Sequence, residues 1–188
     1  MSDIMPTTLE FLQAGWLLLP AGIANALPPL VKKINFLNYP VDFGVTLRGR
    51  PLLGASKTIR GLFFAVLIAI IITYCQAVVY KFQLGGISKI AVIDYASVNI
   101  FYLGFCLGTA AMIGDLLASF LKRQLGIMAG QPFFFMDQLD WIISSGLAVF
   151  IIYSVKIKIL LLAAIIYFVL HILVKWLGYF VGVNNTKL

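Results

Sequence analysis

Long apolar runs recur five times along the chain, and they predict five membrane-spanning helices. Each run approaches the roughly 20 apolar residues that an α-helix needs to cross a bilayer. The runs cover residues 9–31, 61–80, 98–121, 139–155 and 157–180. Backbone polar groups in lipid must be satisfied within the segment, and the strands of membrane barrels are shorter and alternate in polarity. We therefore predict an all-α integral membrane protein in which residues 1–188 form one domain.

The overall composition agrees with this pattern. Apolar residues make up 62% of the chain and charged residues only 11%, whereas about a quarter of a soluble domain is charged. These proportions exclude a disordered chain, a coiled coil and an ordinary soluble enzyme. The two cysteines, Cys75 and Cys106, both lie inside apolar runs, so we do not expect a disulfide framework.

The basic residues between the runs are distributed unevenly and predict the orientation in the membrane. Four lie on the side of the membrane that holds the connections after the second and fourth runs: Lys81, Lys89, Lys156 and Lys158. Ten lie on the other side: Lys32, Lys33, Arg48, Arg50, Lys57, Arg60, Lys122, Arg123, Lys175 and Lys187. Basic loops favour the cytoplasm, so we predict an external N-terminus, a cytoplasmic C-terminus and cytoplasmic loops at 32–60 and 122–138. Topology thus accounts for the net charge of +7, and we expect no nucleic-acid partner.

Three of the seven acidic residues gather near the predicted cytoplasmic ends of the third and fourth runs. Asp115 shares a helix face with Ser119 and Lys122, because the three are spaced i, i+4 and i+7. Asp137 and Asp140 are spaced i, i+3 and also share a face. Carboxylates inside a membrane are costly and usually mark functional sites. The two helix ends are therefore expected to bring the three carboxylates together.

This combination of side chains suits a metal ion and a phosphate group. Carboxylate and hydroxyl oxygens are hard ligands of the kind that Mg²⁺ prefers, together with water and substrate phosphates. Lys122 and Arg123 are cations that bind phosphate through charge-assisted hydrogen bonds. The alternative is that the acids only neutralise nearby lysines and arginines at the membrane surface, where charges are common. The residues alone leave both interpretations open.

The loop before the second run ends in a basic, glycine-containing segment, Gly54–Gly61. Its Gly and Lys residues do not have the spacing of a Walker phosphate loop. A helix entrance of this kind can still bind phosphate through backbone N–H groups and the helix dipole. Alternatively, the loop only sets the topology and contacts lipid headgroups. His171, the single histidine, is interpreted as a helix-packing residue.

Two motifs in this pattern resemble a known family. Ser119–Arg123 reads S-F-L-K-R and Asp137–Asp140 reads D-Q-L-D, which resembles the S-x-L-K-R and D-R-L-D signature of the CTP:phosphatidate cytidylyltransferases. Gln138 stands where the bacterial signature has arginine, and the stretch between the motifs is shorter. With five spans and the K-T-I-R-G segment at Lys57–Gly61, the chain is most similar to the archaeal branch, the CDP-archaeol synthases.

The resemblance implies a reaction and a set of residues. The expected activity is Mg²⁺-dependent transfer of CMP from CTP to an isoprenoid ether-lipid phosphate, 2,3-bis-O-geranylgeranylglycerol 1-phosphate, at the cytoplasmic face of the cell membrane. The products are CDP-archaeol and pyrophosphate. The expected catalytic residues are Asp115, Asp137, Asp140, Lys122 and Arg123, of which the three aspartates would bind the metal. The expected substrate-binding residues are Lys57, Thr58, Arg60, Gly61, Ser119 and Gln138.

Two other functions fit part of this pattern. A CTP-dependent polyprenol or dolichol-type kinase would share a cytoplasmic nucleotide site, but its acceptor is an alcohol and its product is a lipid monophosphate. A small ion-coupled transporter would use Asp115 and Asp140 to carry protons or cations. Transporters usually bind their substrate near the membrane midplane on broken helices, whereas the polar residues here gather at one membrane face.

Overall fold

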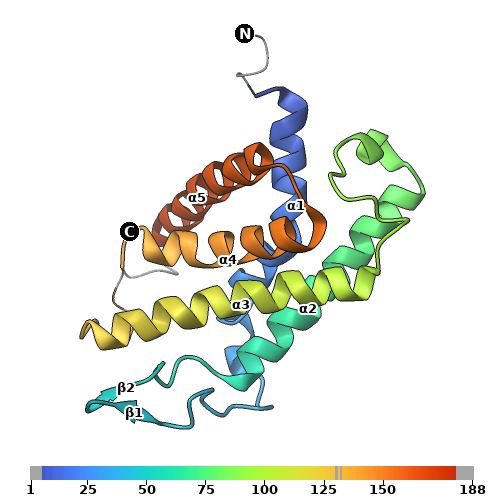
Figure 1. The fold of residues 1–188 in the computed structure, drawn as a ribbon. Coiled ribbons are helices and arrows are strands. Elements are labelled where there is room, and N and C mark those ends of the chain that lie inside the picture. The colour runs from blue at the N-terminus through green and yellow to red at the C-terminus, as the bar shows by residue number, and fades with distance from the viewer. Residues whose placement is uncertain (1–5, 130, 132, 181–188) are drawn as a thin grey trace.

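Five long helices form the protein in the computed structural model, which describes residues 6–129, 131 and 133–180. All five helices are long and apolar enough to cross a membrane, which confirms the prediction of an all-helical protein with five spans (Figure 1). Lys187, one of the ten basic residues used to predict the orientation, lies outside the described residues. The helices are α1 (Thr8–Ala26), α2 (Ile59–Lys81), α3 (Ile100–Gln124), α4 (Met136–Tyr153) and α5 (Ile157–Phe180).

Side-chain caps begin α1 and α2. Thr7 and Glu10 form a capping box at the start of α1, and the hydroxyl of Thr58 accepts a hydrogen bond from the backbone N–H of Gly61 at the start of α2 (3.2 Å). α1 ends at Ala26, five residues before the predicted end of the first run at residue 31. The cause is the Pro28–Pro29 pair, because proline lacks the N–H that would continue the helix. The chain then forms a short 3₁₀ helix, η1 (Leu30–Lys33).

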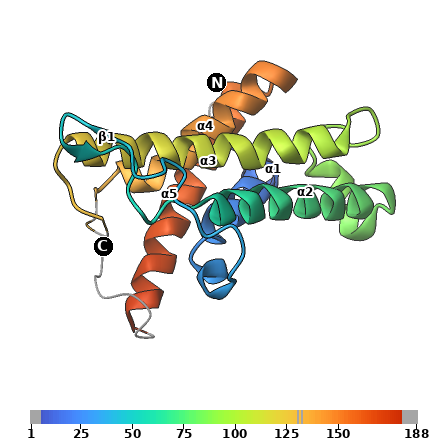
Figure 2. The ribbon, with the colours of Figure 1, turned by 90° about the horizontal axis from the view of Figure 1, so that it is seen from below.

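α2 and α3 cross with their backbones nearly in contact (Figures 1 and 2). A methyl group added to Gly104 would lie 2.6 Å from the Cα of Ile70, and one added to Gly108 would lie 2.8 Å from the Cβ of Ala69. Lipid supplies no hydrophobic driving force between helices, so membrane helices associate through close van der Waals packing. Small residues at such spacing permit that packing. The crossing therefore depends on residues without bulky side chains.

The predicted cytoplasmic loop between α1 and α2 contains a small β-hairpin, which the all-α prediction lacked. β1 (Thr46–Leu47) pairs antiparallel with β2 (Arg50–Pro51). Arg48 and Gly49 at the turn have φ angles of 52° and 75°, as a tight turn with a mirror-image backbone requires. Both ribbon views place the hairpin beside the C-terminal end of α3, where the guanidinium of Arg50 donates a hydrogen bond to the backbone carbonyl of Gln124.

The connection between α2 and α3 lies at the opposite end of these helices and contains the 3₁₀ helix η2 (Leu84–Lys89). A buried polar network ties this connection to α1 and α2. The amide of Gln76 donates to the backbone carbonyl of Trp16 (2.7 Å), and the hydroxyl of Tyr95 donates to the amide oxygen of Gln76 (3.1 Å). These hydrogen bonds fix the connection against the start of the chain at the end of the molecule opposite the hairpin.

Candidate active site

A cavity of about 570 Å³ lies where the end of α1, the start of α2, the second half of α3 and the start of α4 meet α5. Ten of the eleven site residues expected from the sequence line this cavity. They are Lys57, Thr58, Arg60, Gly61, Asp115, Ser119, Lys122, Arg123, Asp137 and Asp140. Residues that are more than 80 positions apart in the chain are thus gathered at one site, on the side predicted to be cytoplasmic.

The basic entrance of α2 meets the acidic face of α3 through an ion pair. The ammonium group of Lys57 lies 2.6 Å from both carboxylate oxygens of Asp115. Lys57 is held in place because the segment that carries it pairs with the chain before it. The backbone N–H of Val41 donates to the carbonyl of Lys57 (2.8 Å), and Pro40 forms an isolated β-bridge with Thr58.

A second ion pair joins the end of α3 to the start of α4. The ammonium group of Lys122 lies 2.9 Å from both oxygens of Asp137, and the Lys122 side chain is only about one-tenth exposed. Asp137 also accepts a hydrogen bond from the backbone N–H of Phe133 (3.0 Å), which fixes the turn into α4. The cavity therefore contains two lysine–carboxylate pairs, each of which joins segments that are far apart in the sequence or belong to different helices.

Asp140 differs from the other two acids because no lysine among the described residues is bonded to it. Its carboxylate accepts a hydrogen bond from the backbone N–H of Trp141 (2.6 Å). Gly114 of α3 packs against the backbone of α4 at this point, where an added methyl group would collide with the backbone carbonyl of Asp140 and the hydroxyl of Ser144. Gly114 thus lets α3 approach α4 closely, next to both Asp115 and Asp140.

Two arginines reach the cavity from buried positions. The guanidinium of Arg60 donates to the carbonyl of Ile34, and that of Arg123 donates to the carbonyl of Ile127. Among the described residues, the Nε–H groups of both arginines have no hydrogen-bond partner. A buried donor without a partner is costly, and arginine is well suited to bind phosphate oxygens. An anion in the cavity would supply the acceptors that these guanidiniums lack.

Asp42, which sequence reasoning missed, organises the loop that carries Lys57. Its buried carboxylate accepts hydrogen bonds from the backbone N–H groups of Gly44 (3.1 Å), Leu53 (2.8 Å) and Gly54 (3.0 Å). Burial alone would raise the pKa of Asp42, but the N–H bonds from Gly54, Leu53 and Gly44 outweigh it and hold that pKa below its ordinary value. The ionised carboxylate therefore closes the loop between Pro40 and Thr58.

Other polar residues of the cavity were not among the expected site residues. They are Asn25, Lys32, Asn38, Ser56 and His171. His171 was interpreted as a packing residue, and the structure places it on the cavity wall. The only signal for Asn25 and His171 was the presence of a polar residue in an apolar span, which also fits a helix contact. Lys32 and Ser56 lie in the connection between α1 and α2, whose folding the sequence pattern does not specify.

Gln138 is the expected site residue that does not line the cavity. It is only 1% exposed, and its side-chain oxygen has no hydrogen-bond partner among the described residues. The start of α4 turns Asp137 toward Lys122 and Asp140 toward the cavity, which leaves Gln138 on another face of the helix. The two aspartates of the motif therefore line the cavity, whereas the side chain of Gln138 is buried outside it.

The donor atoms of the cavity fit Mg²⁺ in one particular way. Within the described parts of the chain, no three His, Cys, Asp or Glu side chains form a ready-made metal cage. Mg²⁺ is usually bound by one or two carboxylates, with phosphate oxygens and waters completing the octahedron. Asp115, Asp137 and Asp140 line the cavity together with the basic residues, so they can supply carboxylates to an ion that arrives with a phosphorylated substrate.

Comparisons with known proteins identify the family. The family model described as CarS-like, CDP-archaeol synthase, matches residues 7–187. This chain belongs to the CDP-archaeol synthase family. The resemblance found in its two motifs is thereby confirmed.

Individual relatives agree with the family model over most of their length. A CDP-archaeol synthase from Methanococcus maripaludis is 32% identical over 168 residues, which are 89% of this chain and 90% of that protein. One from Pyrococcus furiosus is 34% identical over 136 residues, covering 71% of this chain and 72% of the relative. A solved structure, described as an intramembrane enzyme for archaeal membrane lipids biosynthesis, is 30% identical, with a TM-score of 0.66 and coverage of 86% of this chain and 92% of that one.

Membership of the CDP-archaeol synthase family establishes the class of the protein. It is a multi-pass membrane enzyme, a cytidylyltransferase of lipid biosynthesis that forms CDP-archaeol. Its substrates are a nucleotide and a lipid phosphate, both of which carry the anionic groups that the cations of the cavity suit. This class favours the transferase over the kinase and transporter alternatives.

Proposed function

We propose that the cavity transfers CMP from CTP to 2,3-bis-O-geranylgeranylglycerol 1-phosphate, that the reaction requires Mg²⁺, and that it takes place at the cytoplasmic face of the membrane. The observation that carries the proposal is the meeting of three carboxylates and five cations around one cavity of about 570 Å³. The carboxylates are Asp115, Asp137 and Asp140, and the cations are Lys32, Lys57, Arg60, Lys122 and Arg123.

The reaction is a substitution at phosphorus, and the cavity meets its main demand. An oxygen of the lipid phosphate attacks the α-phosphorus of CTP, the bond from that phosphorus to the bridging oxygen breaks, and pyrophosphate leaves with the electron pair. Two polyanions must be brought together, so positioning and charge neutralisation supply most of the catalysis. Arg60 and Arg123, whose Nε–H groups have no partner among the described residues, would bind phosphate oxygens.

The two ion pairs suggest how the charges rearrange when substrate enters. Lys57 bonds Asp115 and Lys122 bonds Asp137, so the lysines neutralise the acids before any polyanion binds. A lysine ammonium is a point charge on a flexible stem. Lys57 and Lys122 can therefore rotate from the carboxylates toward the triphosphate, and the carboxylates then become available as ligands.

Asp115, Asp137 and Asp140 would hold Mg²⁺ in this arrangement. The ion would supply charge neutralisation and a template for the attacking and leaving oxygens. The protein contributes the orientation of the carboxylates. Asp137 is fixed by the N–H of Phe133, and Asp140 by the N–H of Trp141. Ser119 and Thr58 line the same cavity and can donate hydrogen bonds to phosphate oxygens.

The lipid tails would stay in the bilayer throughout. The cavity lies at one end of apolar, membrane-spanning helices. A lipid phosphate can therefore enter it while its isoprenoid chains remain among other lipid chains. The basic excess around loops 32–60 and 122–138 favours the cytoplasmic side, where CTP is present. The substrate then needs no transfer through water.

The test is a reaction with purified protein, labelled CTP, Mg²⁺ and a series of lipid phosphates. We expect a CDP-lipid and pyrophosphate in equal amounts, formed only with a lipid phosphate and only with the metal. A lipid alcohol should give no product. Formation of a lipid monophosphate from the alcohol would instead establish the kinase, and full activity in the presence of a strong chelator would contradict the role of Mg²⁺.

A further inference from the structure

The segment that joins α1 to β2 exposes large apolar side chains, although it lies between two membrane spans. Phe43 is 73% exposed and Tyr39 is 63% exposed. A loop surrounded by water rarely collects so many exposed apolar groups over a short stretch. The full set between positions 30 and 47 is Leu30, Ile34, Phe36, Tyr39, Phe43, Val45 and Leu47.

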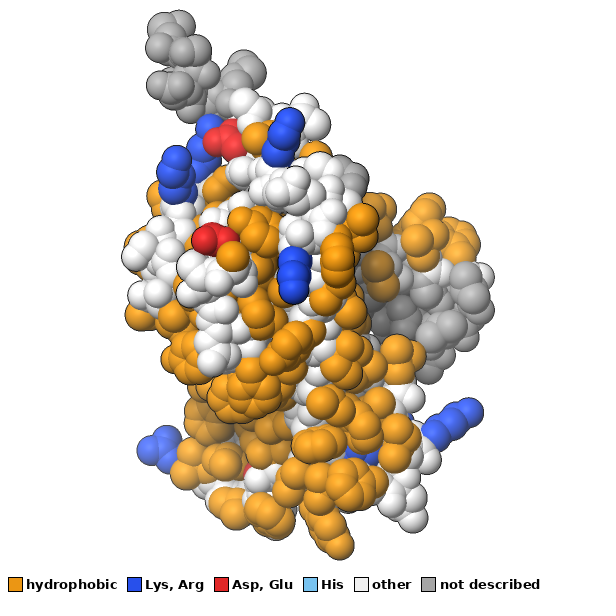
Figure 3. Space-filling view, turned by 90° about the vertical axis from the view of Figure 1, so that its right-hand side faces the viewer, with side chains coloured by type: hydrophobic (Ala, Val, Ile, Leu, Met, Phe, Trp, Pro, Cys, Tyr) orange, Lys and Arg blue, Asp and Glu red, His pale blue; other side chains and the backbone are white. Residues whose placement is uncertain are grey.

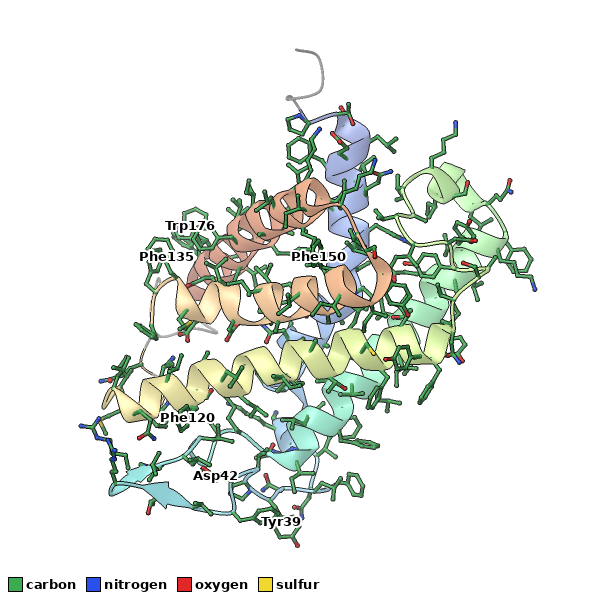
Figure 4. All side chains as sticks on the ribbon, viewed as in Figure 1. Tyr39, Asp42, Phe120, Phe135, Phe150 and Trp176 are labelled. Carbon is green, nitrogen blue, oxygen red and sulfur yellow. The ribbon has the colours of Figure 1, made fainter. Side chains whose placement is uncertain are left out.

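The segment does not stand above the helices but extends along the side of α3. Arg50 bonds the backbone at Gln124, the last residue of α3. Beyond it, Leu52–Leu53 face a stretch of α3 between Ile113 and Phe120 across an apolar cavity of about 320 Å³. At about 1.5 Å per residue, this stretch lies roughly 6–16 Å below Gln124 along the helix. Figure 4 shows Phe120 projecting from α3 toward the loop and Tyr39 pointing away from the helices.

Much of the backbone between Asp42 and Leu53 is hydrogen-bonded within the protein. The carboxylate of Asp42 accepts from three N–H groups, and its carbonyl accepts from the N–H of Val45 (2.8 Å). The N–H of Leu52 donates to the carbonyl of Val45 (2.9 Å), and β1 pairs with β2. In a bilayer, irregular backbone is tolerated only where its polar groups are satisfied by the protein.

The exposed charges of the segment all have one sign. Lys32, Lys33, Arg48 and Arg50 are exposed, whereas Asp42, the single acid between positions 30 and 53, is buried. The lower end of the molecule in Figure 3, which is where this segment lies in Figure 1, is mostly hydrophobic with Lys or Arg side chains at its margins. A cluster of four basic residues beside a membrane span is typical of binding to anionic headgroups.

We propose that residues 30–53 lie in the interfacial layer of the bilayer and bind its anionic lipids. In this arrangement the exposed apolar side chains lie among the upper parts of the lipid chains, and the four cations lie at the level of the headgroups. The partner is the lipid surface itself. The lipid-facing side of α3 continues directly into the apolar surface of the segment through Leu52–Leu53. This placement does not depend on which reaction the cavity performs.

The location of Phe43 tests the proposal directly. A single nitroxide at Phe43→Cys, in a Cys75→Ala and Cys106→Ala background, is reconstituted in vesicles that contain anionic lipid. Its collision rates with oxygen, which concentrates in lipid, and with an aqueous nickel chelate are compared. Leu117→Cys on the exposed side of α3 is the lipid control, and Lys89→Cys in the loop between α2 and α3 is the water control.

We expect the oxygen-to-nickel ratio at position 43 to approach that at position 117 and to exceed that at position 89. A ratio equal to that at position 89 would overturn the proposal, because the segment would then lie in water. Protection from both reagents would also overturn it, since another protein surface would be covering Phe43. In zwitterionic vesicles the ratio should fall toward the water control. An unchanged ratio there would overturn the role of the anionic headgroups.

Discussion

Lys57 and Asp115 form an ion pair across 58 positions of sequence, with the ammonium 2.6 Å from both carboxylate oxygens. The pair joins the segment just before α2 to the second half of α3. It therefore connects the loop organised by Asp42 to the carboxylates of the cavity. Changes on either side of this pair should affect both parts of the site.

Lys57→Ala should reduce kcat/KM for CTP or the lipid phosphate by roughly 10- to 150-fold, which corresponds to the loss of a charge-assisted contact worth about 1.5–3 kcal/mol. The variant also leaves Asp115 without its cation. Lys81→Ala at the other end of α2 is the matched control and should change activity little. Steady-state kinetics of pyrophosphate release measure both. Equal, small effects of the two changes would contradict a role of Lys57 in substrate binding and would leave it only a role in setting the membrane topology.

Asp140→Asn should lose most of its activity, on the order of 10²–10³ in rate, because the amide keeps the shape but not the charge of the carboxylate. The protein should still insert into membranes and stay monodisperse in detergent, and added Mg²⁺ should restore activity only partly. The measurement is CDP-lipid formation against Mg²⁺ concentration. Asp94→Asn, in the loop between α2 and α3, is the control. Normal turnover and metal dependence in Asp137→Asn and Asp140→Asn would show that the metal site lies elsewhere.

Gly114→Ala should impair both stability and activity. The added methyl group collides with the backbone of Asp140 and the hydroxyl of Ser144, and overpacking of this kind costs about 1–3 kcal/mol. Thermal unfolding in detergent and turnover should both decline. Gly15→Ala in α1 is the matched control, because a methyl group there meets no atom within 4 Å. Unchanged unfolding of Gly114→Ala would mean that α3 and α4 are not as close as described.

Asp42→Asn should weaken the loop. The carboxylate has two oxygens that accept hydrogen bonds from three backbone N–H groups, whereas an amide has only one acceptor oxygen. The pKa of Asp42 is below its ordinary value, so its contribution to stability is fully present above the unfolded pKa, near 3.8, and is lost as pH falls through the folded pKa. The difference in melting temperature between the variant and the wild type should therefore be constant from about pH 5 to 8 and should shrink in stronger acid.

Kinetics at neutral pH give a second measure of Asp42. The variant should have a higher KM for CTP, because the position of Lys57 depends on the loop. Asp94→Asn again serves as the control for a general effect of losing a carboxylate. A melting-temperature difference that persists unchanged in strong acid would show that the charge of Asp42 is not what holds the loop together.

The orientation predicted from the basic residues can be tested by labelling from outside intact cells. Lys89→Cys, in a background without Cys75 and Cys106, should react with an impermeant maleimide, whereas Lys33→Cys should react only after the cells are opened. The reason is the excess of basic residues in the loops on the side of Lys33. Labelling of position 33 in intact cells would reverse the orientation and separate the cavity from cytoplasmic CTP.

The sequence predicts those parts of the structure that depend on periodicity within a helix. The i, i+4, i+7 spacing of Asp115, Ser119 and Lys122 places all three on the cavity wall, because a continuous helix fixes their directions. The length of each apolar run likewise predicts each span. The end of α1 differs because the apolar run continues through Pro28–Pro29, where hydrophobicity persists but helical hydrogen bonding cannot.

Other parts depend on contacts that no local pattern encodes. The bonds of Asp42 to Leu53 and Gly54 form only when two turns and the hairpin have folded. A lone aspartate in a loop gives no sign of this role. Gln138 was assigned to the site because it lies between two aspartates of a motif, but a helix directs neighbouring residues about 100° apart. The orientation of α4 against α3 then decides which of them face the cavity.

The crossing of α2 and α3 at Gly104 and Gly108 has a mechanical consequence for the cavity. Lys122 lies 14 residues beyond Gly108 on a continuous helix, so the crossing acts as the pivot of a lever roughly 21 Å long. A rotation of about 5° at the pivot would move Lys122, at the end of that lever, sideways by roughly 2 Å. Displacements of about 1 Å can already cost 10²-fold in rate. The single hydrogen atoms that are the side chains of Gly104 and Gly108 therefore help to set the alignment of charges that lie several helical turns away.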